Sequence, residues 1–361
     1  MVIDQNFWCG KRVFLTGHTG FKGGWLAIWL QSLGAEVFGY SLAPATEPNF
    51  YSVAKVSTVL AGEVIADLGD LAALGIALQQ AKPDVIFHLA AQAIVLQSYQ
   101  DPVQTFATNV VGTVALLDAL RALDTVRAVV VVTSDKCYEN QEWVWGYRES
   151  DRMGGHDPYS ASKGAAELAV SSMRRSYFSA ESYKRHRVGI ATARAGNVIG
   201  GGDWAPHRLI PDLIRALGAE KPCIIRNPNA VRPWQHVLEP LAGYLALAAA
   251  LWRDGPAFSG GWNFGPRADN AKPVKWIADY LSNLWPGAAP LISAEKQTLH
   301  ENSYLKLDIS KATAALDWAP VWCLQTSLGK VIEWHHAHRN GAEMRDCALA
   351  QITQFCDDAC A

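Results

Sequence analysis

Residues 12–24 read RVFLTGHTGFKGG, which predicts a short apolar strand that runs directly into a glycine-rich loop. Residues 25–33 follow with helical apolar spacing, and a second apolar strand is expected at 36–40. A strand, a glycine loop, a helix and a strand within about thirty residues make up a βαβ unit. This unit predicts the first part of an open α/β sheet.

The glycine loop also predicts a ligand. Gly17, Gly20 and Gly23 let the backbone approach a pyrophosphate at the positive end of the following helix. Between a strand and a helix, this spacing favours a dinucleotide site over a glycine turn without a ligand, which is the alternative. His18 and Lys22 are bulkier than many residues in such loops, so they either crowd the pyrophosphate or contact it.

Alternating strands and helices continue beyond this unit. Further apolar strands are predicted at 63–66, 85–90, 128–133 and 188–193, and helices are predicted up to Leu78, over about 103–123 and over about 159–177. Continuous apolar strands between amphipathic helices indicate a parallel sheet that is covered on both faces. We therefore predict an α/β fold, a Rossmann-type doubly wound parallel sheet.

The pattern becomes irregular after Asn197, where glycines and prolines accumulate. The 361 residues are too many for one small domain. We expect a dinucleotide-binding Rossmann domain over 1–196, with 230–266 returning to it. Residues 197–229 and 267–361 are expected to form a smaller C-terminal substrate-binding lobe.

The composition predicts a folded protein without nucleic-acid or membrane partners. Half of the residues are hydrophobic and 18% are charged, so a sizeable core can form. The net charge of −2 comes without a basic stripe, which disfavours a nucleic-acid backbone as partner. The start of the chain lacks the apolar stretch of a signal peptide, and the longest apolar run, residues 241–252, is too short to span a bilayer. We expect a cytoplasmic protein.

No metal site or disulfide framework is predicted. Seven cysteines, an odd number scattered along the chain, fit a reducing compartment. Cys356 and Cys360 have no second cysteine pair nearby, and the HHAH sequence at 335–338 has no clear partner ligands. An ordinary reduced tail and an exposed helix end are the preferred interpretations.

Two groups of residues supply proton-transfer chemistry: Ser134-Asp135-Lys136, and Tyr159 with Lys163. Tyr159 and Lys163 are four residues apart, so they share one face of a helix. The ammonium can then lower the pKa of the phenol and make it a usable base near neutrality. A hydroxyl, a Tyr and a Lys suffice to oxidise an alcohol with a nicotinamide, whereas the extra acid and amine indicate a further step. An exposed Tyr/Lys pair and an Asp135–Lys136 salt bridge are the alternatives.

In this order and spacing, the motifs resemble the extended short-chain dehydrogenase/reductase family over residues 10–334. The glycine loop matches its dinucleotide loop, residues 88–92 (HLAAQ) match its strand beside the cofactor, and Ser134, Tyr159 and Lys163 match its catalytic triad. The resemblance implies NAD as the cofactor, although residues 40–42 (YSL) carry no acid for the ribose hydroxyls and no Arg for a 2′-phosphate lies nearby. The residues expected to bind NAD are Gly17, Thr19, Gly20, Phe21, Lys22, Gly23, Asp67, Leu68, Leu89, Ala90, Ala91, Gln92, Asn109, Thr133, Tyr159 and Lys163.

Within that family, residues 133–138 (TSDKCY), 142–149 (EWVWGYRE) and 157–159 (DPY) resemble the branch of nucleotide-sugar 4,6-dehydratases that acts on CDP-glucose. The dTDP-glucose branch has Glu where this chain has Lys136. The resemblance implies that Tyr159, aided by Lys163 and Ser134, removes the proton from the sugar O4 while C4 gives hydride to NAD. Lys136 would then remove the C5 proton, and Asp135 would protonate the departing C6 hydroxyl.

The nucleotide sugar is expected to contact Asn197 through the family match. Arg208 and Arg232 are the preferred clamps for its diphosphate, because guanidinium binds phosphate oxygens bidentately. Either arginine is otherwise a surface ion pair. Trp143 and Trp145 alternate along an extended segment and share a face, turned either toward the substrate or against a strand.

The resemblance also implies a homodimer through two long helices around 109–120 and 160–174. The alternative enzymes are another nucleotide-sugar dehydratase or a 4-epimerase. The alternative outside enzymes is an NAD-sensing binding protein that kept the fold.

Overall fold

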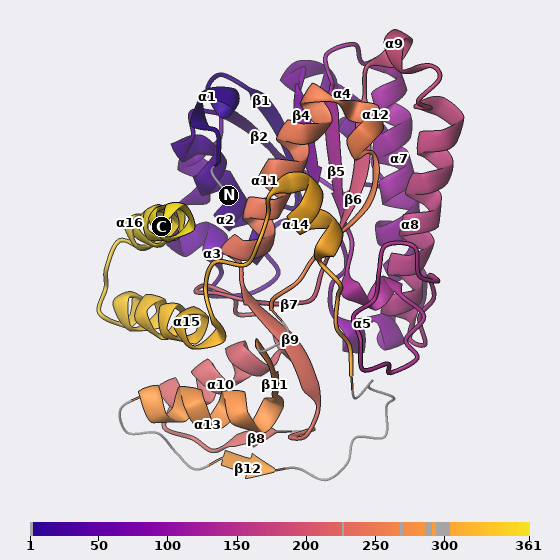
Figure 1. Cartoon of the computed structure of the whole chain (residues 1–361). Helices are drawn as coiled ribbons and strands as arrows, with labels where there is room; N and C mark the ends of the chain where they lie inside the picture. The colour runs from indigo at the N-terminus through magenta and orange to yellow at the C-terminus, as the bar shows by residue number, and fades with distance from the viewer. Residues whose placement is uncertain (1–2, 226, 268–269, 286–290, 294–303) are drawn as a thin grey trace.

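The computed structural model describes residues 3–225, 227–267, 270–285, 291–293 and 304–361 (Figure 1). Within these residues seven strands form the main sheet, in the order β10, β6, β5, β4, β1, β2, β3. Each neighbouring pair of these strands is parallel. The strands are β1 (Arg12–Thr16), β2 (Glu36–Ser41), β3 (Gly62–Ile65), β4 (Val85–His88), β5 (Ala128–Val132), β6 (Gly189–Ala195) and β10 (Gly260–Phe264). The predicted Rossmann-type sheet is confirmed, and its strand order switches between β1 and β4.

Helices cover both faces of this sheet (Figure 1). One face carries α4 (Leu71–Ala81), α7 (Gly112–Ala119) and α8 (Pro158–Tyr177), and the other carries α2 (Phe21–Ser32) and α11 (Leu238–Arg253). The pleat of the strands divides the core accordingly, because Val13 and Leu15 of β1 pack with the α2 and α11 side while Phe14 packs with the α4 and α7 side. Short helices complete the connections: α1 (Gln5–Trp8), α3 (Phe50–Val53), α5 (Val95–Gln100), α6 (Pro102–Phe106), α9 (Tyr183–His186), α12 (Gly255–Phe258) and α14 (Ser310–Leu316).

A second group of elements lies below the main sheet in Figure 1. Strand β9 (Val231–His236) is parallel to β7 (Asn197–Ile199) and antiparallel to β11 (Ala271–Pro273). Strands β8 (Cys223–Ile225) and β12 (Leu291–Ser293) form a further parallel pair. Helices α10 (Leu209–Gly218), α13 (Val274–Leu284) and α15 (Leu324–Arg339) share a core with residues of β7, β8 and β9.

The elements of the C-terminal segment pack on both parts of the molecule. Helix α14 lies against α11 and β10, and the last helix, α16 (Met344–Cys360), lies against α2 and α15. Strand β10 joins the main sheet, whereas β9 belongs to the small one. The division into 1–196 with 230–266, and 197–229 with 267–361, stays a prediction.

The helix predicted over 103–123 is present but interrupted. It consists of α6, a π-type turn (Ala107–Val111), α7 and a final 3-10 turn (Leu120–Ala122). Among the described residues this stretch, Pro102–Ala122, is the one helix long and apolar enough to cross a membrane by length and composition. Its α7 part packs between α4 and α8 beside the sheet, as a core helix of a globular protein does.

Candidate active site

The glycine loop lies at the carboxyl end of β1, where ligands of open α/β sheets bind. Gly17 has a φ of +81°, and a Cβ at this position would come within 2.7 Å of the Ala90 backbone nitrogen. A Cβ at Gly23 would overlap the carbonyl oxygen of Gly17. These two positions therefore require glycine for the turn and for the close approach of the loops after β1 and β4.

The first turn of α2 fits a pyrophosphate. Its N-cap is Gly20, and no side chain of the described residues caps the exposed N–H groups. The twelve-residue helix directs these donors and the positive end of its dipole at the same place. The loop and helix start therefore fit the predicted dinucleotide, with Phe21 packed beside Gly200 on the far side of the turn.

The loop after β4 is held by side chains rather than left open. Thr16 Oγ1 accepts a hydrogen bond from the Ala90 N–H at 3.1 Å. The Asn109 amide donates to the Gln92 carbonyl at 3.0 Å and to Ser162 Oγ at 2.9 Å, and its oxygen accepts from the Gln92 N–H at 2.8 Å. Asn109 thus helps to fix the conformation of the loop formed by Leu89, Ala90, Ala91 and Gln92.

Polar groups at the end of β2 are few. Thr19 Oγ1 and Ser41 Oγ hydrogen-bond each other at 2.8 Å where the ribose of a dinucleotide is expected. Asp67 is exposed near this point, with Oδ1 accepting from the Gly69 N–H at 2.7 Å, and it is followed by buried Leu68. The nearest acid on β3, Glu63, pairs with His18 at 2.6 Å.

The catalytic residues meet at the carboxyl end of β5. Ser134 caps the short turn Asp135–Cys137 by accepting from the Lys136 N–H at 3.2 Å. Helix α8 begins beside it, capped by Asp157, whose carboxylate accepts from the Ser160 N–H, with Pro158 at its first position. Ser134, Asp135, Tyr159 and Lys163 are all buried there, and Lys136 is half-buried.

Asp135 is poised as an acid. Its side chain is 3% exposed, and Oδ2 has no hydrogen-bond partner among the described residues. Burial raises the pKa of this carboxyl, although Lys136 and the Ser134 hydroxyl oppose that effect. A protonated carboxyl with an unpaired oxygen can donate to a leaving hydroxyl.

Tyr159 differs from the expectation drawn from its spacing. Burial raises the pKa of the phenol to about 12, and the strongest opposing influences are a hydrogen bond with Ser134 and the charge of Arg208. The Lys163 ammonium donates instead toward the Val132 carbonyl at 3.5 Å. The physical reason is that a low-dielectric site disfavours the phenolate more than the neighbouring cations favour it.

The loop after β7 brings in one charged residue, Asp203, that the sequence did not identify as part of the site. Asp203, buried, holds the Arg208 guanidinium at 2.9 Å. Burial lowers the pKa of Lys22 to about 7, helped by Arg208 and Lys163, while Asp135 and Asp203 raise it. Lys22 therefore faces the catalytic residues as well as the glycine loop. The only sequence signal for Asp203 was its position five residues before Arg208.

Arg232 reaches the same centre from β9. It is buried, donates to the Val231 carbonyl at 3.1 Å, and is one of the cations that lower the pKa of Asp135. Asn197 starts β7, next to β9 in the small sheet. The structure thus brings Arg208 and Arg232 to the catalytic residues from two separate elements.

Trp143 and Trp145 form the outer end of an aromatic stack. Their ring centroids are 5.3 Å apart, and Trp143 stacks on Tyr147 at 5.5 Å. Tyr147 stacks in turn on Tyr138 at 5.2 Å. The two tryptophan rings contact each other, and Trp145 remains 59% exposed.

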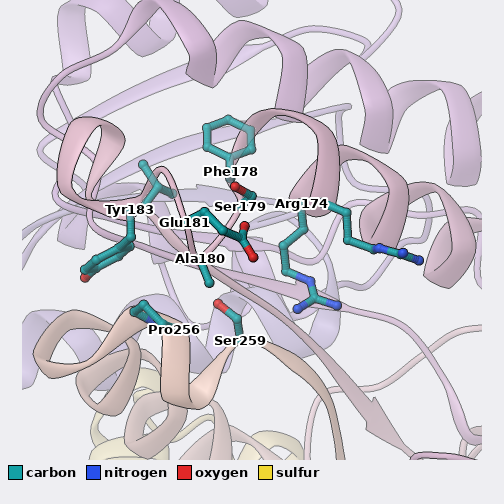
Figure 2. A pocket seen from close by; sticks show the side chains of 10 residues that line it. Arg174, Phe178, Ser179, Ala180, Glu181, Tyr183, Pro256 and Ser259 are labelled. Atoms are coloured by element: carbon teal, nitrogen blue, oxygen red, sulfur yellow. The ribbon is translucent and has the colours of Figure 1, made fainter.

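A separate pocket of about 350 Å³ lies at the far end of α8 from Tyr159 (Figure 2). It is lined by Arg174, Phe178 and Tyr183, among others, and by Pro256 and Ser259 of the segment around α12. None of the predicted site residues lines it. No group of three or more His, Cys, Asp or Glu side chains in the described part of the chain is placed to hold a metal ion.

Comparison of the sequence with known proteins identifies its family. Residues 13–256 match the model of the NAD dependent epimerase/dehydratase family. The chain belongs to this family. The family predicted from the sequence is therefore confirmed, and with it the class of nucleotide-sugar enzymes.

Relatives extend over the whole chain. It is 49% identical over 354 residues to CDP-glucose 4,6-dehydratase of Salmonella typhimurium (strain LT2), with 98% of each chain covered. It is 26% identical to dTDP-glucose 4,6-dehydratase of Xanthomonas campestris pv. campestris (strain ATCC 33913), over 89% of this chain and 92% of that one.

Solved structures share the fold. UDP-glucose 4-epimerase of Thermotoga maritima, solved with UDP-glucose, superimposes with a TM-score of 0.78 at 18% identity, covering 91% of this chain and 99% of that chain. MoeE5 in complex with UDP-glucose and NAD superimposes with a TM-score of 0.75 at 25% identity, covering 91% of this chain and 99% of that chain.

Proposed function

We propose that the protein is an NAD-dependent CDP-glucose 4,6-dehydratase, a hydro-lyase that converts CDP-glucose to CDP-4-keto-6-deoxyglucose and water. The observation that carries this proposal is the burial of an acid, Asp135, beside the Ser134, Tyr159 and Lys163 triad, in a chain 49% identical to an enzyme of that name. An oxidoreductase that only moves hydride at C4 has no use for a second acid and amine at this point.

The oxidation half of the reaction uses the triad. Tyr159 must first lose its own phenol proton, and its phenolate oxygen, hydrogen-bonded by Ser134, then takes the proton of the sugar O4. Lys163 provides a positive charge beneath them. NAD, when bound, would supply the hydride acceptor for C4 and the hydride donor for C6.

Elimination then uses the pair that follows Ser134. The 4-ketone makes the C5 hydrogen acidic, and Lys136 removes it as a proton. The electron pair of that C–H bond forms the C5–C6 double bond as the C6–O bond breaks, and Asp135 gives its proton to the leaving hydroxyl, which departs as water. Hydride at C6 and a proton at C5 complete the 4-keto-6-deoxy sugar.

NAD would lie across the switch between β1 and β4. The residues proposed to hold its pyrophosphate are Gly17, Gly20 and the first turn of α2, with Lys22 alongside. The adenosine end would meet Asp67, and the ribose would meet Thr19 and Ser41 in place of the acid common in such sites. The substrate diphosphate is assigned to Arg232 and Arg208, and the nucleotide to the lobe that begins at Asn197.

A cytoplasmic homodimer is proposed for the assembly. Apolar side chains are exposed on α6, on the π-type turn that follows it and on α8, including Val103 at 79%, Val111 at 63% and Leu168 at 63%. Helices with a buried face on the sheet and a second exposed apolar face suit association with another copy. Val111 and Leu168 lie in the two stretches, 109–120 and 160–174, through which the family resemblance implies a dimer.

Product mass tests the function directly. The protein would be incubated with NAD and a panel of CDP-, dTDP-, UDP- and GDP-sugars. Loss of one water from CDP-glucose is the expected result. Loss of water from another nucleotide sugar would identify that sugar as the substrate. An isobaric product would identify the protein as a 4-epimerase. Binding of NAD without turnover would identify it as a binding protein.

A further inference from the structure

A carboxylate outside the predicted site lies buried one helical turn beyond Lys163. Glu167 is 5% exposed and accepts four hydrogen bonds. Two come from the hydroxyls of Thr133 at 2.5 Å and Thr192 at 2.7 Å. Two come from Arg194, through Nε at 2.9 Å and Nη2 at 2.7 Å.

The partner of Glu167 connects further segments. Arg194 is 4% exposed, and its Nη1 donates to the Tyr138 hydroxyl at 2.7 Å and to the Glu149 carbonyl at 3.2 Å. The guanidinium also lies 5.1 Å from the centroid of the Tyr138 ring. The buried guanidinium of Arg194 thus contacts α8, the segment after β5, and the segment 142–149 that carries the aromatic stack.

The location of this pair relates it to the reaction. Thr133 directly precedes Ser134, and Glu167 follows Lys163 by four residues on α8. The pair therefore fastens the strand end that carries the acid to the helix that carries the base. A buried ion pair seldom stabilises a fold more than apolar side chains of the same size would. The four hydrogen bonds to the Glu167 carboxylate therefore indicate a role other than stability.

The charges around Lys163 also support an electrostatic role for Glu167. Burial lowers the pKa of Lys163 to about 8, while Cys137 and Glu167 raise it. Burial raises the pKa of Cys137, so that thiol is neutral at neutral pH. The other groups facing Lys163 are Lys22, which disfavours a second ammonium, and His88, whose pKa of about 3 leaves it neutral.

We propose that Glu167 and Arg194 are positioning residues for this reaction: Glu167 keeps the Lys163 ammonium charged, and the Arg194 fork fixes α8 against the Ser134 and Asp135 segment. Resting on the proposed function, this adds to it two residues that act through others without touching the substrate. The negative charge of Glu167 is the feature that distinguishes its role from packing.

The decisive experiment is the pH profile of the first half-reaction in Glu167→Gln. Single-turnover NADH absorbance would be followed after mixing the NAD-loaded enzyme with nucleotide sugar between pH 6 and 10. The ammonium is present below the Lys163 pKa and is lost as the pH rises through it, so the rate should fall on the alkaline side. Removing the Glu167 charge lowers that pKa, and the alkaline limb should move to lower pH by about half a unit or more.

A second variant separates charge from geometry. Arg194→Lys keeps the positive charge and loses the two-pronged contact, so kcat should fall about tenfold or more with KM changed less than threefold, while the alkaline limb stays in place. Asp279→Asn, in an exposed pair on α13, is the matched control and should change neither quantity. Should Glu167→Gln fail to fold, Thr192→Val removes one hydrogen bond from the Glu167 carboxylate. This leaves the negative charge less screened, so the alkaline limb should move to higher pH, by a smaller amount than in Glu167→Gln.

The outcomes separate this inference from the function on which it rests. An unshifted alkaline limb in Glu167→Gln and Thr192→Val, with wild-type oxidation intact, overturns the role of Glu167. An unchanged kcat in Arg194→Lys overturns that of Arg194. A wild-type enzyme that oxidises no nucleotide sugar overturns the proposed function itself.

Discussion

The Ser134 hydroxyl lies 3.1 Å from Oδ1 of Asp135, and Oδ2 of the same carboxyl has no hydrogen-bond partner among the described residues. One hydroxyl therefore joins the phenol that takes the first proton to the acid that gives up the next one. Because burial raises the pKa of Asp135, the protonated form of this carboxyl is more favoured than it is in an exposed aspartate.

Asp135→Asn should block elimination without blocking oxidation. The amide keeps the shape of the carboxyl but has no acidic proton for the departing C6 hydroxyl, so turnover should fall about 100-fold or more. NADH formed in the first step should accumulate to a stoichiometric absorbance at 340 nm. Normal decay of that absorbance would rule out Asp135 as the acid.

Lys136→Ala tests the proposed base at C5. The first hydride transfer should proceed through Tyr159, and NADH should then decay slowly because the C5 proton stays in place. In heavy water the intact enzyme should incorporate deuterium at C5, and the variant should incorporate little, as read by proton NMR of the product. Full labelling at the wild-type rate would assign the base to another residue.

Tyr159→Phe should strongly slow the first step, oxidation at C4. Removal of the phenol oxygen eliminates the acceptor for the O4 proton, so single-turnover NADH formation should slow by about 100-fold or more. The ring remains to fill the buried site, so thermal unfolding and NAD binding should stay close to wild type. Near-normal oxidation would exclude Tyr159 from this role.

Arg232→Ala and Arg208→Ala should differ in their kinetics. Arg232 is assigned to the substrate diphosphate, which it holds equally in the ground and transition states, so KM should rise at least tenfold with kcat little changed. Arg208 is also one of the groups that lower the pKa of Tyr159, so its removal should lower kcat as well. An unchanged KM for Arg232→Ala would transfer the clamp to Arg208.

Stability should depend on Glu239 between pH 5 and 7.5. Burial raises the pKa of this carboxyl to about 7, against hydrogen bonds from the Val321 and Trp322 N–H groups. The folded protein thus binds a proton that the unfolded chain releases above its ordinary pKa. The free energy of unfolding should fall as the pH rises across this window, by about 3 kcal/mol at most from this group.

Urea unfolding of Glu239→Gln would check this contribution. The variant should lose that part of the pH dependence, whatever its stability at a single pH. Glu220→Gln, at an exposed position, is the control and should keep the wild-type slope. Equal slopes in wild type and Glu239→Gln would contradict the prediction.

The local parts of the fold and site followed from the sequence alone. The strand, glycine loop and helix around Gly17, and the Tyr159–Lys163 pair one turn apart on α8, depend on residues within a few positions of one another. Periodicity and spacing determine such features, because the helix and the strand each have a fixed repeat. The parallel sheet followed in the same way, from a succession of apolar segments.

Only the tertiary structure determined which distant residues are buried together and which charges lie close enough to shift each other's pKa. Glu167 and Arg194 are 27 positions apart, and Lys22 is more than 180 positions from Asp203 and Arg208, whose charges act on it. No repeat in the sequence links these residues. Burial also reversed an expectation, since the pKa of Tyr159 rises although a lysine lies one turn away. The free energy of a charge depends on the dielectric and on every neighbour in three dimensions, and a linear pattern carries neither.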